Sequence, residues 1–238
     1  MKWLAWSLFV YCCSLLATLP ASLGLAQVAP QLAAALPYLA GTVWRGNGIA
    51  PRNAAGLHEF GWTTDVGSLW SGCWIGDLTF SGRGQTQARL CNESFELSEL
   101  QMQFPVAQAL PALQMPASIA AGRVAVSVDN LNVSADMVVA SGRIIWRDAF
   151  AGLGQAVDLG TVEAQLRGLG KSLILEVKNA DSELLLDLKI AVTTDKTYQM
   201  RGTIEPTGSL VNRNDFALFG ERLANGRIVV RQAGVIAL

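Results

Sequence analysis

The chain has 238 residues, of which 51% are hydrophobic and 16% are charged, and its net charge is −1 with an isoelectric point near 5.9. No dense block of lysine and arginine occurs, so the sequence lacks the basic stripe that neutralises phosphates, and we expect no nucleic-acid partner. The charged fraction is below the roughly 25% of soluble domains, which indicates a membrane segment and much buried β-structure.

An uncharged apolar run opens the chain. After Lys2 no charged residue occurs before Arg45. A bilayer core needs about 20 apolar residues in a helix, so the sequence predicts a transmembrane signal-anchor helix over residues 1–27, with a kink or an end near Pro20. The large apolar side chains of this expected anchor include Trp3, Trp6, Leu8, Phe9, Leu15 and Leu16.

Charge predicts the orientation of this helix. Lys2 and the α-amine precede it, so the positive-inside rule leaves the N-terminus in the cytoplasm and exports the rest. A cleavable signal peptide is the alternative, because Gly24, Leu25 and Ala26 resemble a small-residue cleavage site. The minimal charged region and the long apolar run favour a retained anchor. Both interpretations export the remaining chain.

Two cysteines lie in the exported part, each flanked by strand-like segments. An oxidising compartment favours a disulfide between Cys73 and Cys91, which would stabilise the domain by about 3 kcal/mol in the chain-entropy model. The alternative is two free buried thiols. His58 is the single histidine and no Cys-x-x-Cys pair occurs, so we expect no metal site and no cofactor.

The rest of the chain indicates a mainly β fold. Residues 28–40 form a Pro- and Ala-rich connector with room for a short helix, and residues 41–238 form the expected periplasmic domain. Short alternating segments at spacings of about 8–12 residues, separated by Gly, Asn and Asp turn signals, predict an antiparallel β-meander. One strand is expected to begin at Gly61. The other expected strands span residues 42–45, 69–75, 78–80, 124–128, 131–133, 137–139, 142–147, 160–166, 172–177, 183–192, 198–204 and 226–231.

A few short helices are expected between the strands. Leu97, Leu100 and Phe104 fit one helical face that ends at the next proline. Residues 106–115 offer a second helical turn between prolines. Residues 213–224 interrupt the alternating pattern and indicate another short helix.

The sequence offers little for catalysis. His58 with Asp65 and Ser68 or Ser71 would be the one candidate triad, but no Gly-x-Ser-x-Gly elbow exposes a nucleophile. No Gly-rich phosphate loop is followed by Lys and Ser or Thr. We therefore expect a protein without enzymatic activity.

The exported part of the chain is unusually rich in tryptophan. Trp44, Trp62, Trp70, Trp74 and Trp146 fall in expected strands. Packing within the sheet is the simpler interpretation, because aromatic residues bury a large area and favour strands. The alternative is an apolar groove or a partner surface, where tryptophan is enriched.

Five short segments follow one another in a recognisable order. They are Gly-Thr-Val-Trp-Arg-Gly-Asn-Gly at residues 41–48, Leu69-Trp70, a Pro-punctuated Leu segment at 110–116, the segment 122–131 and Gly-x-Ile-x-Trp-Arg-x-Ala at 142–149. The ordered set resembles the protein N family of the bacterial type II secretion system (general secretion pathway protein N). The resemblance covers nearly the whole chain.

This resemblance implies a single-pass protein of the Gram-negative inner membrane whose C-terminal domain lies in the periplasm. Such a protein would be an accessory component that helps exported proteins pass the outer-membrane secretin, with the inner-membrane platform or the secretin as partners. The residues that carry the match are Trp44, Arg45, Trp70, Trp146 and Arg147, as structural or interaction residues. The domain is also similar to extended β-sheet envelope proteins that handle lipid, which implies an alternative function as a periplasmic β-groove protein for lipid or another apolar ligand.

Overall fold

The computed structural model of the chain describes the residues that follow. They are residues 11, 14–15, 18–23, 38–49, 59–80, 84–91, 94–109, 120–134, 136–153, 155–180, 182–195, 197–208, 210 and 220–235. At residues 69–71, 108–109, 153 and 155–156 the description covers the backbone alone.

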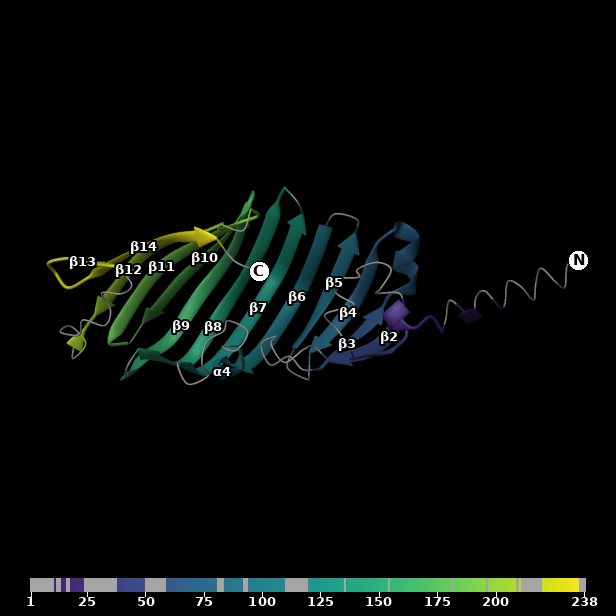
Figure 1. Cartoon of the computed structure of the whole chain (residues 1–238), viewed down its shortest axis with the longest axis horizontal. Coiled ribbons are helices and arrows are strands. Elements are labelled where there is room, and N and C mark those ends of the chain that lie inside the picture. The colour runs from purple at the N-terminus through teal and green to yellow at the C-terminus, as the bar shows by residue number, and fades with distance from the viewer. Residues whose placement is uncertain are drawn as a thin grey trace, which may run out of the picture.

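One antiparallel sheet of fourteen strands forms the described fold (Figure 1). Strands β1 to β12 lie in the sheet in chain order, β14 pairs with β12, and β13 pairs with β14. The prediction of a mainly β, antiparallel meander is thereby confirmed. The strands are β1 (Tyr38–Gly41), β2 (Arg45–Ile49), β3 (Glu59–Thr64), β4 (Trp74–Phe80), β5 (Gly84–Cys91), β6 (Ser94–Pro105), β7 (Ala120–Ser134), β8 (Val138–Leu153), β9 (Gln155–Leu169), β10 (Ser172–Ala180), β11 (Leu184–Thr193), β12 (Thr197–Pro206), β13 (Glu221–Arg222) and β14 (Ile228–Val235).

The strand register sorts side chains onto two different faces. Leu175 of β10 lies opposite Leu166 of β9 and Ile190 of β11. Its neighbour Glu176 lies opposite Gln165 and Lys189. Because successive side chains of a strand point to opposite faces, one face collects aliphatic residues and the other collects polar and charged ones. We call them the apolar face and the outer face.

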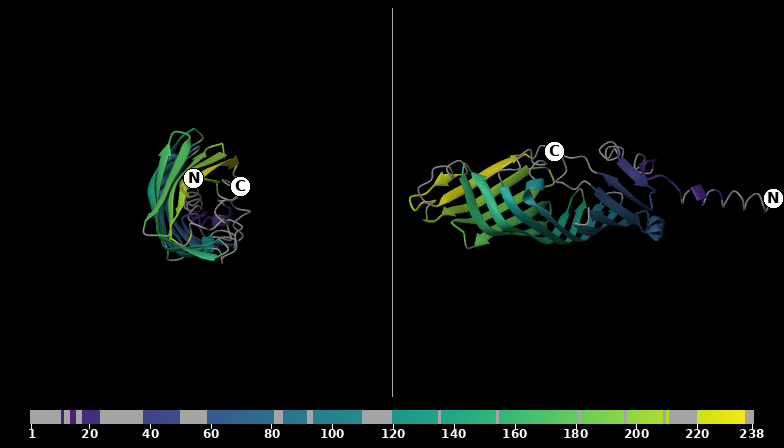
Figure 2. Two further views of the ribbon diagram at one scale, coloured as in Figure 1. Left: turned by 90° about the vertical axis from the view of Figure 1, so that its left-hand side faces the viewer. Right: turned by 90° about the horizontal axis from the view of Figure 1, so that it is seen from below.

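The sheet curves around its long axis, so that it forms an arc when viewed from one end (Figure 2). The buried core cluster consists of apolar-face residues of β8 to β14 together with Leu210, and Ile228 and Val230 are each only 1% exposed. Because the buried side chains of the sheet belong to the apolar face, we infer that this face lies on the inside of the curve. Burial at this end of the sheet supplies the hydrophobic stabilisation of the fold.

No helix among the described residues is long and apolar enough to cross a membrane. Of the expected anchor residues, Leu15 is described and is 51% exposed, whereas Trp3, Trp6, Leu8, Phe9 and Leu16 lie outside the described residues. β1 begins at Tyr38, within the connector expected over residues 28–40. The anchor and its orientation therefore stay predictions.

The helix predicted from Leu97, Leu100 and Phe104 is wrong, because these residues lie in β6. The register between β5 and β6 shifts at this level, and Glu99 takes a φ of 55°. This bulge inserts one residue, so Leu97 and Leu100 share the apolar face at a spacing of three. A strand with a bulge thus imitates the helical period.

The strand expected at residues 42–45 is displaced toward the C-terminus. Residues 42–44 connect β1 to β2, and Gly46 and Gly48 lie within β2. The rings of β3 occupy the space that side chains would fill there. A Cβ on Gly46 would stand 2.3 Å from Cζ2 of Trp62, and one on Gly48 would stand 2.5 Å from Cζ of Phe60.

The strand expected at residues 69–75 begins late. Residues Val66–Ser71 form a 3-10 helix, η1, and β4 starts at Trp74. Asp65 caps η1, because its carboxylate accepts from the Gly67 N–H at 3.0 Å and its carbonyl accepts from the Ser68 N–H at 3.1 Å. Capping by an aspartate before the first turn favours helix over strand.

Short helices are fewer in the described residues than predicted. Helix α4 (Val106–Ala109) confirms the start of the turn predicted over residues 106–115. Residues 213–219 lie outside the described residues, but Glu221–Arg222 form β13 and Leu223–Gly226 turn the chain into β14. The C-terminal end of the helix predicted over residues 213–224 is therefore wrong, since Asn-Gly there makes a hairpin turn.

Candidate functional site

The apolar face is continuous from β3 to β11, and no charged residue occupies its regularly paired positions in the part of it that the structure describes. Its aliphatic and aromatic members come from every strand in this range, because each strand contributes alternate residues. The central strands show its composition. Its members on β6, β7, β8 and β10 include Leu100, Met102, Phe104, Val124, Val126, Val128, Ile144, Trp146, Leu173, Leu175 and Val177.

Polar side chains on this face form their hydrogen bonds within the protein. Trp62 Nε1 donates to the Thr42 carbonyl at 3.1 Å, and Trp74 Nε1 donates to Thr64 Oγ1 at 2.9 Å. Asn179 Nδ2 donates to the carbonyls of Leu159 and Leu184 at 2.9 and 2.8 Å. With these donors already paired, an occupant of the face would meet hydrocarbon rather than free polar groups.

Much of this face is only half-buried. Val126, Ile144, Leu166 and Leu175 have intermediate exposure. At its margin, Leu90 is 41% and Phe95 is 38% exposed. An extended exposed apolar surface of this kind is typical of interaction or ligand sites.

The motif residues predicted from the sequence do not form one site. Arg45 lies on β2 and Arg147 on β8, and both are exposed on the outer face. Six strand spacings of about 4.8 Å separate them, or about 29 Å measured along the sheet. Trp44 lies in the connection before β2 and is half-buried.

Trp146 has a structural contact. It lies on the apolar face, where its Nε1 donates to the Ala121 carbonyl at 2.9 Å and so connects β8 to β7. The backbone of Trp70 lies in η1, and its side chain is outside the described residues. Packing is the role that these positions support, while a partner role for them stays a prediction.

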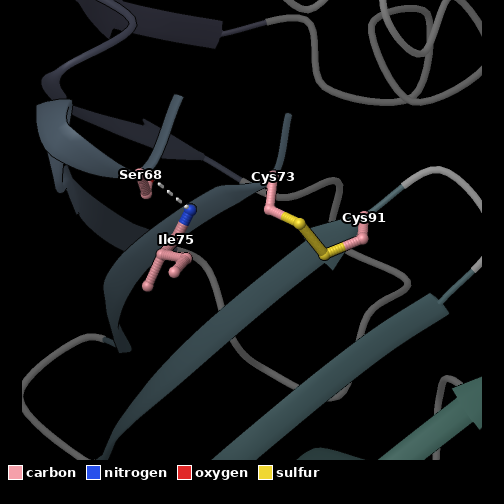
Figure 3. The surroundings of a disulfide bond; sticks show 4 residues. All are labelled: Ser68, Cys73, Ile75 and Cys91. Carbon is pink, nitrogen blue, oxygen red and sulfur yellow. Dashed lines mark hydrogen bonds between the residues drawn. A yellow bond between two sulfur atoms is a disulfide. The ribbon is translucent and has the colours of Figure 1, made fainter. Parts of the chain in front are cut away.

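The structure contains the disulfide between Cys73 and Cys91, which joins the start of β4 to the end of β5 across a sequence separation of 18 (Figure 3). Beside it, Ser68 Oγ donates to the Asp65 carbonyl at 2.6 Å and accepts from the Ile75 N–H at 3.1 Å. Ser68 is therefore engaged with backbone groups rather than presented as a nucleophile. His58 lies outside the described residues.

Candidate metal ligands and titratable groups give no centre in the described part of the chain. No group of three or more His, Cys, Asp or Glu side chains gathers there. Asp195 has a lowered pKa, chiefly because the Thr193 hydroxyl donates to its carboxylate. This residue lies in the turn between β11 and β12, away from the apolar face.

The outer face carries matched ion pairs along the C-terminal strands. Lys189 Nζ lies 3.4 Å from Glu176 Oε1, and Lys178 Nζ lies 3.6 Å from Asp187 Oδ2, in each case directly across two neighbouring strands. Since these side chains are largely exposed, each pair stabilises by about 0–1 kcal/mol. They keep the outer face hydrophilic.

Two arginine pairs on the outer face break this pattern and were missed by the sequence analysis. Arg123 lies opposite Arg147, and Arg201 lies opposite Arg231. These residues are far apart in sequence, so no local motif marks them. Only the strand register brings them together.

Comparison with known protein families shows to which of them the chain is similar. The family model described as "Type II secretion system (T2SS), protein N" matches residues 35–231, which is most of the chain and nearly all of the described sheet. No curated protein and no solved structure shows significant similarity to the chain.

Proposed function

The chain belongs to the type II secretion system protein N family, and from this membership we propose that it is an accessory inner-membrane component that aids protein export across the outer membrane. The observation that carries the proposal is the family match over residues 35–231. In this proposal the apolar run at residues 1–27 holds the protein in the inner membrane. The sheet lies in the periplasm, where it contacts the inner-membrane platform or the secretin.

The exposure of two arginines on the outer face, and the distance between them, support contacts with protein partners. Arg45 and Arg147 are exposed there without an ion pair to any described residue. Arginine is enriched at interaction hot spots because its guanidinium forms several directed hydrogen bonds. Because the two arginines lie far apart along the sheet, they mark an extended contact surface rather than a pocket. An extended surface suits a protein that assembles with others.

Photo-crosslinking in cells tests this proposal. A photoreactive amino acid at Arg45 or Arg147 should yield adducts with other secretion components, identified by mass spectrometry. Gln165, exposed on the outer face of β9, is the control position and should yield fewer adducts. A complete absence of secretion components from the adducts at both arginines would contradict the proposal.

The membrane placement has its own test. A reporter active only in the periplasm, fused after Leu238, should be active if the anchor holds its predicted orientation. An N-terminal mass measurement on protein purified from membranes would show Met1 or its neighbour if the anchor is retained. A chain that starts after Ala26 would instead show a cleaved signal peptide.

A second candidate function is binding of hydrocarbon chains, such as those of a lipid. The observation that favours it is the continuous, half-buried apolar face, whose polar side chains have their hydrogen bonds paired internally. An acyl chain needs no hydrogen-bond partner, so this surface matches it. A protein carrying lipid in this way would act in envelope biogenesis.

Adjacent residues with opposite orientations provide the test. Leu175 lies on the apolar face and Ile174 on the outer face of the same strand, and both are half-buried. Lipid that copurifies with the full chain should fall in amount for Leu175→Gln and stay unchanged for Ile174→Gln. Absence of copurifying lipid from the unaltered chain, or an equal loss in both variants, would remove this candidate.

A further inference from the structure

Three cationic side chains form a row across the C-terminal strands of the outer face. Lys189 of β11 lies opposite Arg201 of β12, which lies opposite Arg231 of β14. Lys189 is paired with Glu176. Arg201 and Arg231 form no ion pair with any residue that the structure describes.

Such a row is unfavourable by itself. Like charges directly opposite each other on neighbouring strands destabilise a sheet. The next strand pair shows the usual solution, since Lys178 lies opposite Asp187 there. No carboxylate lies directly opposite Arg201 or Arg231 on a described strand, so an anion from outside the chain would relieve the repulsion.

The two arginines also line a cavity. Its volume is about 690 Å³, and its lining comes from residues Gln199–Gly202 and Val229–Ala233 of the two paired strands. This volume falls in the range of small-molecule sites and greatly exceeds one phosphate ion. Gln199 adds an amide group on the side of the arginines, and Val229 and Ala233 add apolar surface to the lining.

We propose that Arg201 and Arg231 bind a phosphate group carried on a larger organic molecule, which occupies the cavity lined by the paired strands β12 and β14. Guanidinium groups donate paired hydrogen bonds to phosphate oxygens, and two of them balance the charge of a phosphate. Arg201 keeps donors for this purpose, because within the described residues its side chain makes one hydrogen bond, from Nη2 to Gln199 Oε1 at 3.3 Å. The phosphate belongs either to a lipid headgroup or to a soluble phosphate ester. The proposal does not depend on the role in secretion.

Binding and thermal unfolding of the full chain in a neutral detergent test the proposal. The probes are inorganic phosphate, glycerol 3-phosphate, dihexanoyl phosphatidylglycerol and its zwitterionic phosphatidylcholine counterpart. At least one of the organic phosphates should bind more tightly than inorganic phosphate and raise Tm, because a ligand of the folded state stabilises it. Arg201→Gln and Arg231→Gln should each weaken this binding at least tenfold.

Arg167→Gln is the matched control. Arg167 is exposed on the outer face of β9 and donates to Gln165 at 2.9 Å, as Arg201 does to Gln199, but no cation lies opposite it on either neighbouring strand. This variant removes the same charge and should keep binding within twofold of the unaltered chain. Without ligand at low salt, the two site variants should unfold at the same Tm or higher, since a repulsion is removed. This measurement separates loss of binding from loss of folding.

The pattern of binding identifies the source of the phosphate. Tightest binding of phosphatidylglycerol assigns a lipid headgroup, and tightest binding of glycerol 3-phosphate assigns a soluble ester. The proposal is overturned if no organic phosphate binds more tightly than inorganic phosphate, or if Arg167→Gln loses as much affinity as the site variants.

Discussion

At the scale of single residues, the side chain of Asn179 connects three neighbouring strands near the end of β10. Its Nδ2 donates to two carbonyls, on β11 and on β9, and its Oδ1 accepts from the Leu186 N–H at 2.6 Å. The side chain thus takes part in hydrogen bonds to both strands that flank β10. A polar residue can be kept on an apolar face when all its hydrogen bonds are made.

Asn179→Asp should lower the free energy of unfolding by about 2–3 kcal/mol, because a carboxylate cannot donate to the two carbonyls and is repelled by them. Urea unfolding followed by circular dichroism measures the change. Asn47→Asp is the control, as Asn47 is exposed on β2, and we expect a change below about 0.5 kcal/mol there. Equal effects at the two positions would show that the hydrogen bonds of the Asn179 side chain do not stabilise the fold.

Gly122 permits the contact between β7 and β8 beside Trp146. Its φ is 113°, and a Cβ there would lie 2.4 Å from the Asp148 carbonyl oxygen and 2.6 Å from Trp146 Nε1. Gly122→Ala should therefore destabilise by about 2–4 kcal/mol, from backbone strain and from the collision together.

The comparison for this substitution is Gly170→Ala. Gly170 also has a positive φ, of 61°, but nothing lies within 4 Å of its Cβ position. Only strain of about 1–2 kcal/mol is expected at this position. Urea midpoints of the two variants give the difference, and a smaller loss at Gly122 than at Gly170 would refute the collision.

At the scale of elements, the sequence predicts strands best where alternation is unbroken. The segments 172–177, 183–192 and 198–204 match β10, β11 and β12 closely because each keeps a period of two between clear turns. Prediction fails where another constraint acts. The bulge at Glu99 imitates a helical spacing, and the aromatic rings of β3 make glycine acceptable inside β2.

Of the candidate site, the sequence predicts the disulfide and the strand positions of Trp62, Trp74 and Trp146, whereas Trp44 and Trp70 lie outside the strands expected for them. It does not predict the shared apolar face or the pairing of Arg201 with Arg231. Both depend on cross-strand register, which bulges at several strands shift by one residue. Register is a property of neighbouring strands and is not encoded in either strand alone.

The disulfide gives the clearest prediction for an element. Cys73 and Cys91 tie together the β4–β5 hairpin, which lies far along the sheet from the core cluster of β8 to β14. Replacing both cysteines by serine should lower the stability of this part by about 3 kcal/mol, through the freedom gained by the unfolded loop. Limited proteolysis of the hairpin measures the change. Reduction of the disulfide should make the unaltered chain as sensitive to proteolysis as the double variant, and it should not change the double variant. If neither the substitution nor the reduction speeds cleavage of the hairpin, the disulfide does not stabilise it.

At the scale of the whole molecule, the sheet resembles a one-dimensional array. Up to β12 each strand pairs with its neighbours in sequence, so the two ends of the sheet share no strand pairing. The buried cluster that includes Val157, Leu184 and Ile228 belongs to the C-terminal half. Stability in such an array is set locally, by each unit and its neighbours. The N-terminal strands, held by a disulfide rather than by that cluster, should open independently of it.

Hydrogen exchange of the full chain tests this independence. Ile228→Ala removes a side chain that is 1% exposed in the cluster and should cost about 2–4 kcal/mol. Amide exchange should then accelerate in β9 to β14 and stay unchanged in β2 to β5, because opening of one part does not require opening of the other. Val66→Ala, at a residue that is 56% exposed, should change neither part. Equal acceleration along the entire sheet would mean that the fourteen strands unfold as one cooperative unit, and the local account of stability would then be wrong.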